Sequence, residues 1–334
     1  SGTVLDSPPI SVASLTSVAE AYPEVSWNGQ TFLVLWHDDN DLRRVAYGAR
    51  VFESGTVMAP GRFRIGGETA WRPCAAWGDD SHLGVWADSQ AGIDSLSYRI
   101  AAARVSASGT VLGGGPFVIH RGNGIRKPRV AWNGSEYLVV WIRQLPNVTN
   151  GTVEAKRVAA DGTLIDAAPI LLCRVPGEKR TPDVASDGSE FLCVWIDDRG
   201  VTHEGFGNHD VYQTRVTAAG EVLTPGGVPI YVDPIREADE VTVACSGASY
   251  LTAWGAYWAT SAYDILGSII APGGSVEDTG FPLSRSYDDQ SAPAAAWLGG
   301  SYLIVYQEDG TASLSDVRAT RLDPAGQLLD PNLS

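Results

Sequence analysis

Lysine is the least frequent charged residue in this sequence. It occurs only at Lys127, Lys156 and Lys179, so arginine supplies almost all of the positive charge. The 24 Lys and Arg residues stand against 39 Asp and Glu, for a formal net charge of −15. Binding to nucleic acid needs a basic surface, so this balance argues against nucleic acid as a partner. It also disfavours an anionic membrane surface and is compatible with divalent cations.

Long hydrophobic runs are missing as well. The longest strongly apolar stretches, such as 137–142, have the length of a strand and fall far short of the roughly 20 residues of a membrane span. We therefore expect no insertion into a membrane. No signal peptide is recognisable at Ser1, which fits either a mature start or a trimmed chain.

Cysteine is scarce, and its spacing excludes two kinds of site. The four cysteines are Cys74, Cys173, Cys193 and Cys245. None forms a Cys-x-x-Cys pair, so a zinc knuckle or a dithiol redox motif is not expected.

What the sequence does contain is a repeat that runs from end to end. Its clearest copies read PEVSWNGQTFLVLW from Pro23 and PRVAWNGSEYLVVW from Pro128. Six copies start at positions 23, 73, 128, 182, 241 and 293, a period of 50 to 59 residues. The copy at 73 is one residue shorter, and the copy at 241 has lost the proline. A period of this size is typical of the blades of a β-propeller.

Each repeat predicts four strands, A to D. Asn28-Gly29, Asn133-Gly134 and Asp187-Gly188 are strong signals for a two-residue hairpin between strands A and B. Strand C ends at a recurrent arginine, and a second glycine turn leads to strand D, which often starts with proline, as suits an outer edge strand. We expect blades at about 22–65, 72–119, 127–172, 181–232, 240–284 and 292–331, the last completed by 1–14.

The two ends of the chain match each other. The last repeat lacks strand D, and residues 2–10 (GTVLDSPPI) resemble the turn and D strand at 162–170 (GTLIDAAPI). We therefore predict an all-β fold: one six-bladed β-propeller domain over 1–334, built of four-stranded antiparallel blades. The strand at residues 8–12 would join the last blade in a 3+1 arrangement. The alternative is a β-helix or an open solenoid, which does not explain the matching ends.

This unit, PxVAWNGxxYLVVW followed by an RVxxxG turn, resembles tandem propeller repeats of large secreted or surface proteins of bacteria, myxobacteria among them. The resemblance covers essentially the whole chain and implies export to the cell surface or the medium. It carries over no catalytic residue. The sequence lacks the Ser-x-Asp-x-Gly-x-Thr-Trp box of sialidase-like propellers, the Trp-Asp ending of WD40 blades and the calcium loops of integrin-type repeats.

Repetition within one chain separates scaffold from site. A residue that recurs in the same slot serves the blade, which makes the recurrent tryptophans core residues. The recurrent arginines should hydrogen-bond to neighbouring turns: Arg50, Arg104, Arg157, Arg215 and Arg321. Cys193 and Cys245 occupy slots that hold Val34 and Trp27 in the first repeat. We therefore expect the cysteines to be unpaired small hydrophobes, although an even count in an exported protein normally favours disulfides.

Candidate ligand residues lie in the B–C and D–A loops, which vary while the other turns are alike. One group is aromatic, because flat rings stack on sugars and proteins with little loss of entropy: Tyr257, Trp258, Tyr263 and Tyr287. A basic group on the same face could receive a carboxylated or sulfated ligand, and includes Arg126, Arg199 and Arg285. Packing over the blade and pairing with surface carboxylates are the alternatives.

The longest B–C loop, 197–210, contains the residue types of a metal site. Asp197, His203, His209 and Asp210 could hold zinc or another transition metal, although their spacing matches no defined motif and a solvated loop is the alternative. Asp38, Asp88, Asp197 and Glu308 sit at equivalent loop positions, where hydrogen bonds that cap the loop, or calcium, would explain the repetition.

The contrast between one uniform face and one diverse face predicts a non-enzymatic extracellular binding module for a glycan or a surface protein. A monomer or a part of a longer polypeptide fits this reading. The alternative functions are a hydrolase or lyase that acts on polysaccharide at the mouth of the channel, and a structural spacer without a ligand. A glycoside hydrolase would need two carboxylates roughly 5–9 Å apart.

Overall fold

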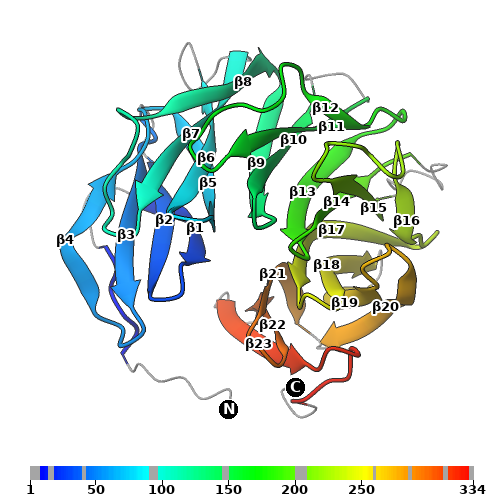
Figure 1. Ribbon diagram of the computed structural model, residues 1–334. Helices are drawn as coiled ribbons and strands as arrows, with labels where there is room; N and C mark the ends of the chain where they lie inside the picture. Colours follow the sequence, from blue (N-terminus) through cyan, green and yellow to red (C-terminus); the bar gives the residue numbers. More distant parts are fainter. Residues whose placement is uncertain are drawn as a thin grey trace. The chain divides into compact units, whose positions relative to one another are not determined.

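The computed structural model describes residues 8–13, 19–39, 43–89, 97–144, 150–199, 209–258, 261–284, 288–310 and 315–330. Within them lie 23 strands, grouped into six antiparallel sheets that follow one another along the chain. This is a six-bladed β-propeller, and the prediction of that fold class is confirmed (Figure 1). In these ranges no helix is long and apolar enough to cross a membrane.

The chain divides into two compact units. Unit 1 comprises 1–139 and 156–168, and unit 2 comprises 140–155 and 169–334. The prediction of a single domain over 1–334 stays a prediction.

Unit 1 contains the first two sheets, and in each of them the four strands lie in chain order. The first consists of β1 (Ala19–Trp27), β2 (Thr31–Asp39), β3 (Ala46–Phe52) and β4 (Val57–Arg64). The second consists of β5 (Ala70–Trp77), β6 (Ser81–Ser89), β7 (Ser97–Ser106) and β8 (Phe117–Asn123).

The third sheet has strands assigned to both units. It consists of β9 (Ile125–Trp132), β10 (Glu136–Arg143), β11 (Thr152–Ala159) and β12 (Ile170–Cys173), again in chain order. In unit 1 the first strands β1, β5 and β9 of successive sheets are neighbours, as expected of the inner strands of propeller blades.

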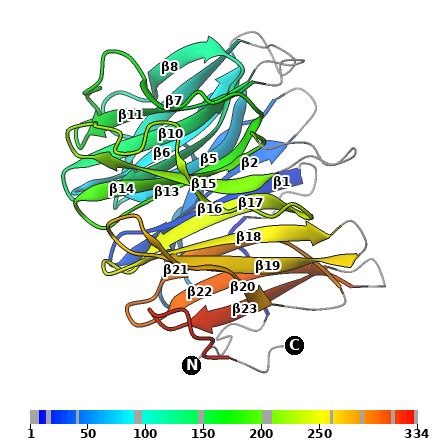
Figure 2. The same ribbon diagram turned by 90° about the vertical axis from the view of Figure 1, so that its right-hand side faces the viewer.

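Unit 2 contains the last three sheets. The fourth is built of β13 (Lys179–Ser186), β14 (Glu190–Asp197), β15 (Asp210–Thr217) and β16 (Val228–Tyr231), and the fifth of β17 (Arg236–Cys245), β18 (Tyr250–Trp258), β19 (Ser261–Ile270) and β20 (Val276–Ser284). The sixth has β21 (Asp289–Trp297), β22 (Tyr302–Asp309) and β23 (Ser315–Leu322). The inner strands β13, β17 and β21 are neighbours, and the fifth and sixth sheets stack on one another (Figure 2).

The sixth sheet has three strands in the described part of the chain, where four were predicted. Residues 8–13 are described without strand conformation, so the 3+1 closure by 8–12 stays a prediction.

The Asn-Gly turns form as the sequence predicts. The Oδ1 of Asn28 accepts hydrogen bonds from the backbone N–H of Gln30 and Thr31 at 2.9 and 2.7 Å. Gly29 takes φ +88°, a left-handed conformation that glycine adopts without a steric penalty. Asn133 and Asp187 accept the same pair of bonds in later repeats. The side chain of the turn residue therefore fixes the register between strands A and B.

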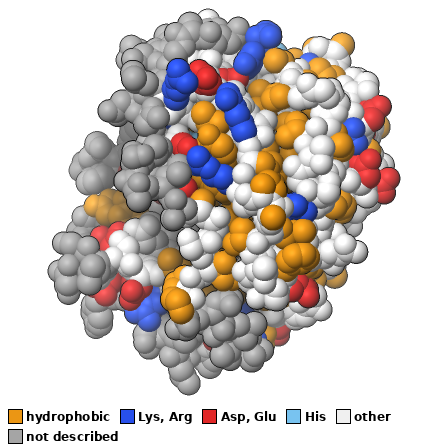
Figure 3. Space-filling model, turned by 90° about the vertical axis from the view of Figure 1, so that its left-hand side faces the viewer, with side chains coloured by type: hydrophobic (Ala, Val, Ile, Leu, Met, Phe, Trp, Pro, Cys, Tyr) orange, Lys and Arg blue, Asp and Glu red, His pale blue; other side chains and the backbone are white. Residues whose placement is uncertain are grey.

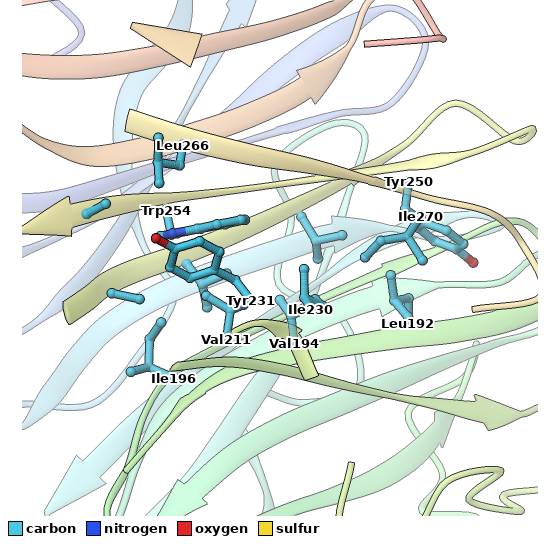
Figure 4. Close-up of a cluster of buried hydrophobic side chains, with 14 residues drawn as sticks. Leu192, Val194, Ile196, Val211, Ile230, Tyr231, Tyr250, Trp254, Leu266 and Ile270 are labelled. Carbon is cyan, nitrogen blue, oxygen red and sulfur yellow. The ribbon is translucent and has the colours of Figure 1, made fainter. Parts of the chain in front are cut away.

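The recurrent Trp of strand B forms the core between sheets. In unit 2, Trp254 is fully buried together with apolar side chains of the fourth and fifth sheets, including Leu192, Val194 and Ile230 (Figure 4). In unit 1, Trp86 is fully buried with Leu33, Leu35 and Ile65.

All four cysteines are free thiols, which confirms the prediction from their slots.

Three of the five recurrent arginines join consecutive sheets, as predicted, whereas Arg157 and Arg321 pair with Asp166 and Asp330 of their own repeats. Arg50 donates to the carbonyl of Ala107, Arg104 to that of Asp161, and Arg215 to that of Pro272, each at 3.2 or 3.3 Å. Each acceptor lies in the C–D turn of the next sheet. On the side shown in Figure 3, basic side chains lie among hydrophobic ones.

Candidate functional site

Every inner strand contains the same irregularity near its start. Six non-glycine residues, one per inner strand, have φ between +35° and +54°: Tyr22, Arg72, Lys127, Thr181, Glu240 and Ala292. The register against strand B shifts at this point, for example between Ala21 and Glu24 in β1 and between Asp239 and Val241 in β17. Each is thus a β-bulge that turns the strand and re-aims its side chains. The bulge residue belongs to the scaffold by position, whereas its side chain differs in every blade.

In unit 2 three carboxylates gather around one tyrosine. Burial, followed by the negative charges of Asp239, Asp289 and Glu237 and the neighbouring Tyr257, raises the pKa of Tyr263. The backbone N–H of Tyr263 also donates to the Oδ1 of Asp289 at 3.0 Å. Asp239 and Glu237 come from β17, Asp289 from β21 and Tyr263 from β19, so three strands converge at this point.

An aromatic pair lies beside these carboxylates. The rings of Tyr257 and Tyr263 are 4.5 Å apart between centroids, at an interplanar angle of 31°. Glu237 lies opposite Tyr257 in the β17–β18 register. Two of the four predicted aromatic ligand residues are therefore brought together. The side chain of Trp258 and all of Tyr287 lie outside the described residues.

A guanidinium completes this group. Arg180, on β13, donates to the Oε2 of Glu178 at 2.9 Å. That hydrogen bond raises the pKa of Arg180, and the charges of Asp239 and Asp198 act in the same direction. We call the set Arg180, Glu237, Asp239, Tyr257, Tyr263 and Asp289 the acidic cluster.

The predicted metal residues do not assemble as expected. Asp197 is fully buried and paired with Lys179 at 2.9 Å, and it also accepts from the indole N–H of Trp195 at 2.8 Å and from Arg199. His209 instead approaches Glu237, with its Nδ1 3.2 Å from Oε2. Among the described residues, no three His, Cys, Asp or Glu side chains are arranged to hold a metal ion. His203 lies outside them, so a metal site that includes it stays a prediction.

Asp210 is buried by its surroundings rather than directed to a common site. Burial, together with the nearby charges of Asp197, Asp233 and Asp198, raises its pKa to about 6, against the hydrogen bond from the backbone N–H of Asp233. Arg199, predicted to bind a ligand, points inward: it donates to Asp197 and to the carbonyl of Gly226, and it stacks on Tyr212 with 3.8 Å between guanidinium carbon and ring centroid.

The recurrent loop acids each hold an arginine. Asp38 pairs with Arg62 at 3.4 Å, Asp88 with Arg99 at 2.6 Å and Glu308 with Arg318 at 3.0 Å, while Asp197 pairs with Arg199. These pairs favour the loop-fixing role over the calcium alternative.

Unit 1 carries a different chemistry at the starts of its inner strands. Arg126 is exposed on β9, and Arg285, which was predicted with Arg126 and Arg199 to bind a ligand, lies outside the described residues. Arg72 and Lys127 occupy the bulge positions of β5 and β9. On β1, the bulge residue Tyr22 stacks on His37.

Sequence reasoning missed most of the acidic cluster. Glu237, Asp239 and Asp289 stand two to four residues before the repeat copies that start at 241 and 293, in D–A loops for which the sequence predicted only aromatic and basic ligand residues. A signal was present: the residues that precede the repeat proline, or its replacement Val241, differ in charge from copy to copy.

Comparison with known proteins yields fold neighbours only. No protein-family model and no curated protein matches the sequence. An α-L-arabinanase from Penicillium chrysogenum, complexed with arabinobiose, is similar in structure with a TM-score of 0.58 and 11% identity over 93% of this chain and 94% of the other. A neuraminidase-like protein of A/little yellow-shouldered bat/Guatemala gives a TM-score of 0.54 and 9% sequence identity over 90% of this chain and 94% of the other. A prolyl endopeptidase gives a TM-score of 0.52 and 14% sequence identity over 94% of this chain but only 44% of the other.

These neighbours correct one prediction. We expected a non-enzymatic binding module, but the chains that share this fold along nearly their whole length include an arabinanase. The comparison overturns the non-enzymatic interpretation.

Proposed function

We propose that this protein is a glycoside hydrolase that acts on a polysaccharide, with the acidic cluster of unit 2 as its active site. The observation that carries the proposal is the convergence of Asp239, Asp289 and Glu237 on Tyr263, beside the ring of Tyr257. Glycoside hydrolysis uses a pair of carboxyl groups, one as general acid and the other as base or nucleophile. A tyrosine pair offers a flat surface for a sugar ring.

Asp239 and Asp289 are the catalytic pair in this proposal. Both are exposed to solvent, and they come from the inner strands of two different sheets. Glu237 is engaged with His209 and suits a supporting role. The Tyr263 backbone holds Asp289 in place through its N–H. Arabinan is the first substrate to test, because an arabinanase has this fold. An extracytoplasmic location is part of the proposal, because polysaccharides are encountered outside the cell.

The test is release of reducing sugar from arabinan and a panel of other plant and bacterial polysaccharides. Asp239→Asn and Asp289→Asn keep the side-chain shape but remove proton transfer, so each should lower kcat by roughly 10²–10⁴-fold. The matched control is Asp278→Asn, an exposed carboxylate on the outer strand β20, which should retain full activity. Wild-type rates in both variants, or no hydrolysis of any polysaccharide, would refute the proposal.

A further inference from the structure

Arg72 of unit 1 is held by stacking rather than by a carboxylate. It occupies the bulge position of β5, and its guanidinium carbon lies 4.1 Å from the centroid of the Tyr22 ring. Tyr22 belongs to the equivalent bulge of β1. Tyrosine faces attract a guanidinium, and stacking leaves the N–H groups at the guanidinium edge free to point elsewhere.

The stack beneath Arg72 is rigid. Tyr22 stacks on the fully buried His37 with 5.4 Å between centroids, and His37 stacks on Trp71 with 5.6 Å. Arg44 covers Trp71 at 3.9 Å, and its backbone bonds to Ala70 and Glu68 fix it against the start of β5. Arg72 therefore rests on a series of packed rings, which lowers the entropy it would lose on binding a ligand.

The hydrogen-bonding capacity of Arg72 is unused within the described part of the chain. Its buried Nε has no hydrogen-bond partner there, and no described carboxylate forms an ion pair with it. Other arginines of unit 1 differ: Arg99 pairs with Asp88 at 2.6 Å, and Arg129 with Glu24 at 3.5 Å. Leaving a half-buried guanidinium without an acceptor is costly, and an acceptor supplied by a ligand would remove that cost.

Positive charge extends from Arg72 to the neighbouring inner strand. Lys127 fills the same bulge position of β9, and the exposed Arg126 precedes it. In a chain of net charge −15, such a concentration of cations on adjacent inner strands marks a place for an anion. The planar fork of an arginine matches a carboxylate, which can accept two parallel hydrogen bonds.

We propose that Arg72, backed by Tyr22, is a binding site for the carboxylate of an acidic sugar. The site belongs to unit 1 alone. The choice of a glycan as the source of the carboxylate rests on the proposed function, whereas the recognition of a carboxylate rests on Arg72 itself.

The experiment is isothermal titration of the full chain, carrying Asp239→Asn to prevent turnover, with a galacturonic acid trimer. Arg72→Ala should weaken binding at least about tenfold, because a charge-assisted bidentate contact is lost. Arg72→Asn tolerates the left-handed backbone at this position and should weaken binding equally, which separates the effect from misfolding. Arg72→Lys keeps the charge without the fork and should bind several-fold more weakly than the parent. Arg43→Ala, which removes the same charge from an exposed arginine, is the control and should change the affinity less than about twofold.

Two further ligands separate the possible results. The methyl ester of the same trimer has no carboxylate and should bind weakly and equally to all variants. A short poly-glutamate peptide should bind less tightly than the trimer; tighter binding that depends on Arg72 would contradict a glycan source. Unchanged trimer affinity in Arg72→Ala and Arg72→Asn would overturn the site itself. Because binding is measured without turnover, a failure to bind the trimer through Arg72 can be distinguished from a failure to hydrolyse polysaccharide.

Discussion

At the scale of single residues, a side chain that departs from the repeat can be compared with the side chains that fill the same slot in other blades. His82 fills a slot that holds Phe32, Tyr137 and Phe191 in other blades. It is buried, its Nδ1 lies 2.9 Å from the Oγ of Ser26, and burial lowers its pKa from 6.5 to about 4. As the pH falls from about 6.5 to about 4, the unfolded chain therefore takes up a proton that the folded chain does not. The contribution of His82 to the free energy of unfolding is therefore complete above about pH 6.5 and is lost as the pH falls toward about 4.

His82→Phe should remove this acid sensitivity. Between pH 7.5 and 4.5 the wild type should lose roughly 2 kcal/mol more of its unfolding free energy than the variant, because each pKa unit is worth about 1.4 kcal/mol. Urea unfolding at the two pH values measures the difference, and the other titrating groups cancel in the comparison. An identical pH dependence in both proteins would show that the pKa of His82 is the same in the folded and unfolded chains.

At the scale of the strand, the bulge before the repeat proline is the recurrent device. It places an L-residue in a left-handed conformation that favours glycine. Ala292, on β21, has φ +51° and an exposed side chain that contributes little packing. Ala292→Gly should therefore raise the free energy of unfolding by about 1 kcal/mol, in spite of the greater freedom of glycine in the unfolded chain.

The neighbouring Ala294 offers a matched control. It is also exposed on β21 but has no positive φ. Ala294→Gly should therefore destabilise the protein by roughly 0.5–1 kcal/mol. Thermal or chemical unfolding of the two variants should move in opposite directions, and a loss of stability in both would argue against strain at the bulge.

At the scale of the whole molecule, the sixth sheet has a free outer edge in the described part of the chain. Its third strand is β23, on which Val317 is 81% exposed. If the N-terminal strand of the sequence match fills this edge, deletion of residues 1–14 should remove roughly 3 kcal/mol or more of a total of about 5–15 kcal/mol. The exposed edge should also cause dimerisation or aggregation.

Deletion of residues 332–334 is the comparison, and it should leave stability nearly unchanged. Calorimetry and light scattering measure both effects. Equal behaviour of the two truncated proteins would show that closure by residues 8–12 is wrong.

The sequence by itself determined the architecture, because scaffold residues repeat. Asn28-Gly29 predicted a hairpin through local backbone geometry, Trp86 and Trp254 predicted core through their slots, and Arg104 predicted a link to a neighbouring turn. Local patterns of this kind are decided within a few residues of chain, and six copies confirm one another.

The candidate site was decided only by the tertiary structure. Asp239, Tyr263 and Asp289 are separated by 24 and 26 residues in the chain and meet because β17, β19 and β21 converge. Arg199 lies in a variable loop and still turns inward, because the buried carboxylate of Asp197 attracts it more strongly than solvent does. Arg72 sits on Tyr22 because equivalent bulges of adjacent inner strands bring them together. Electrostatic and stacking contacts of this kind depend on distance in space, which periodicity along the chain does not contain.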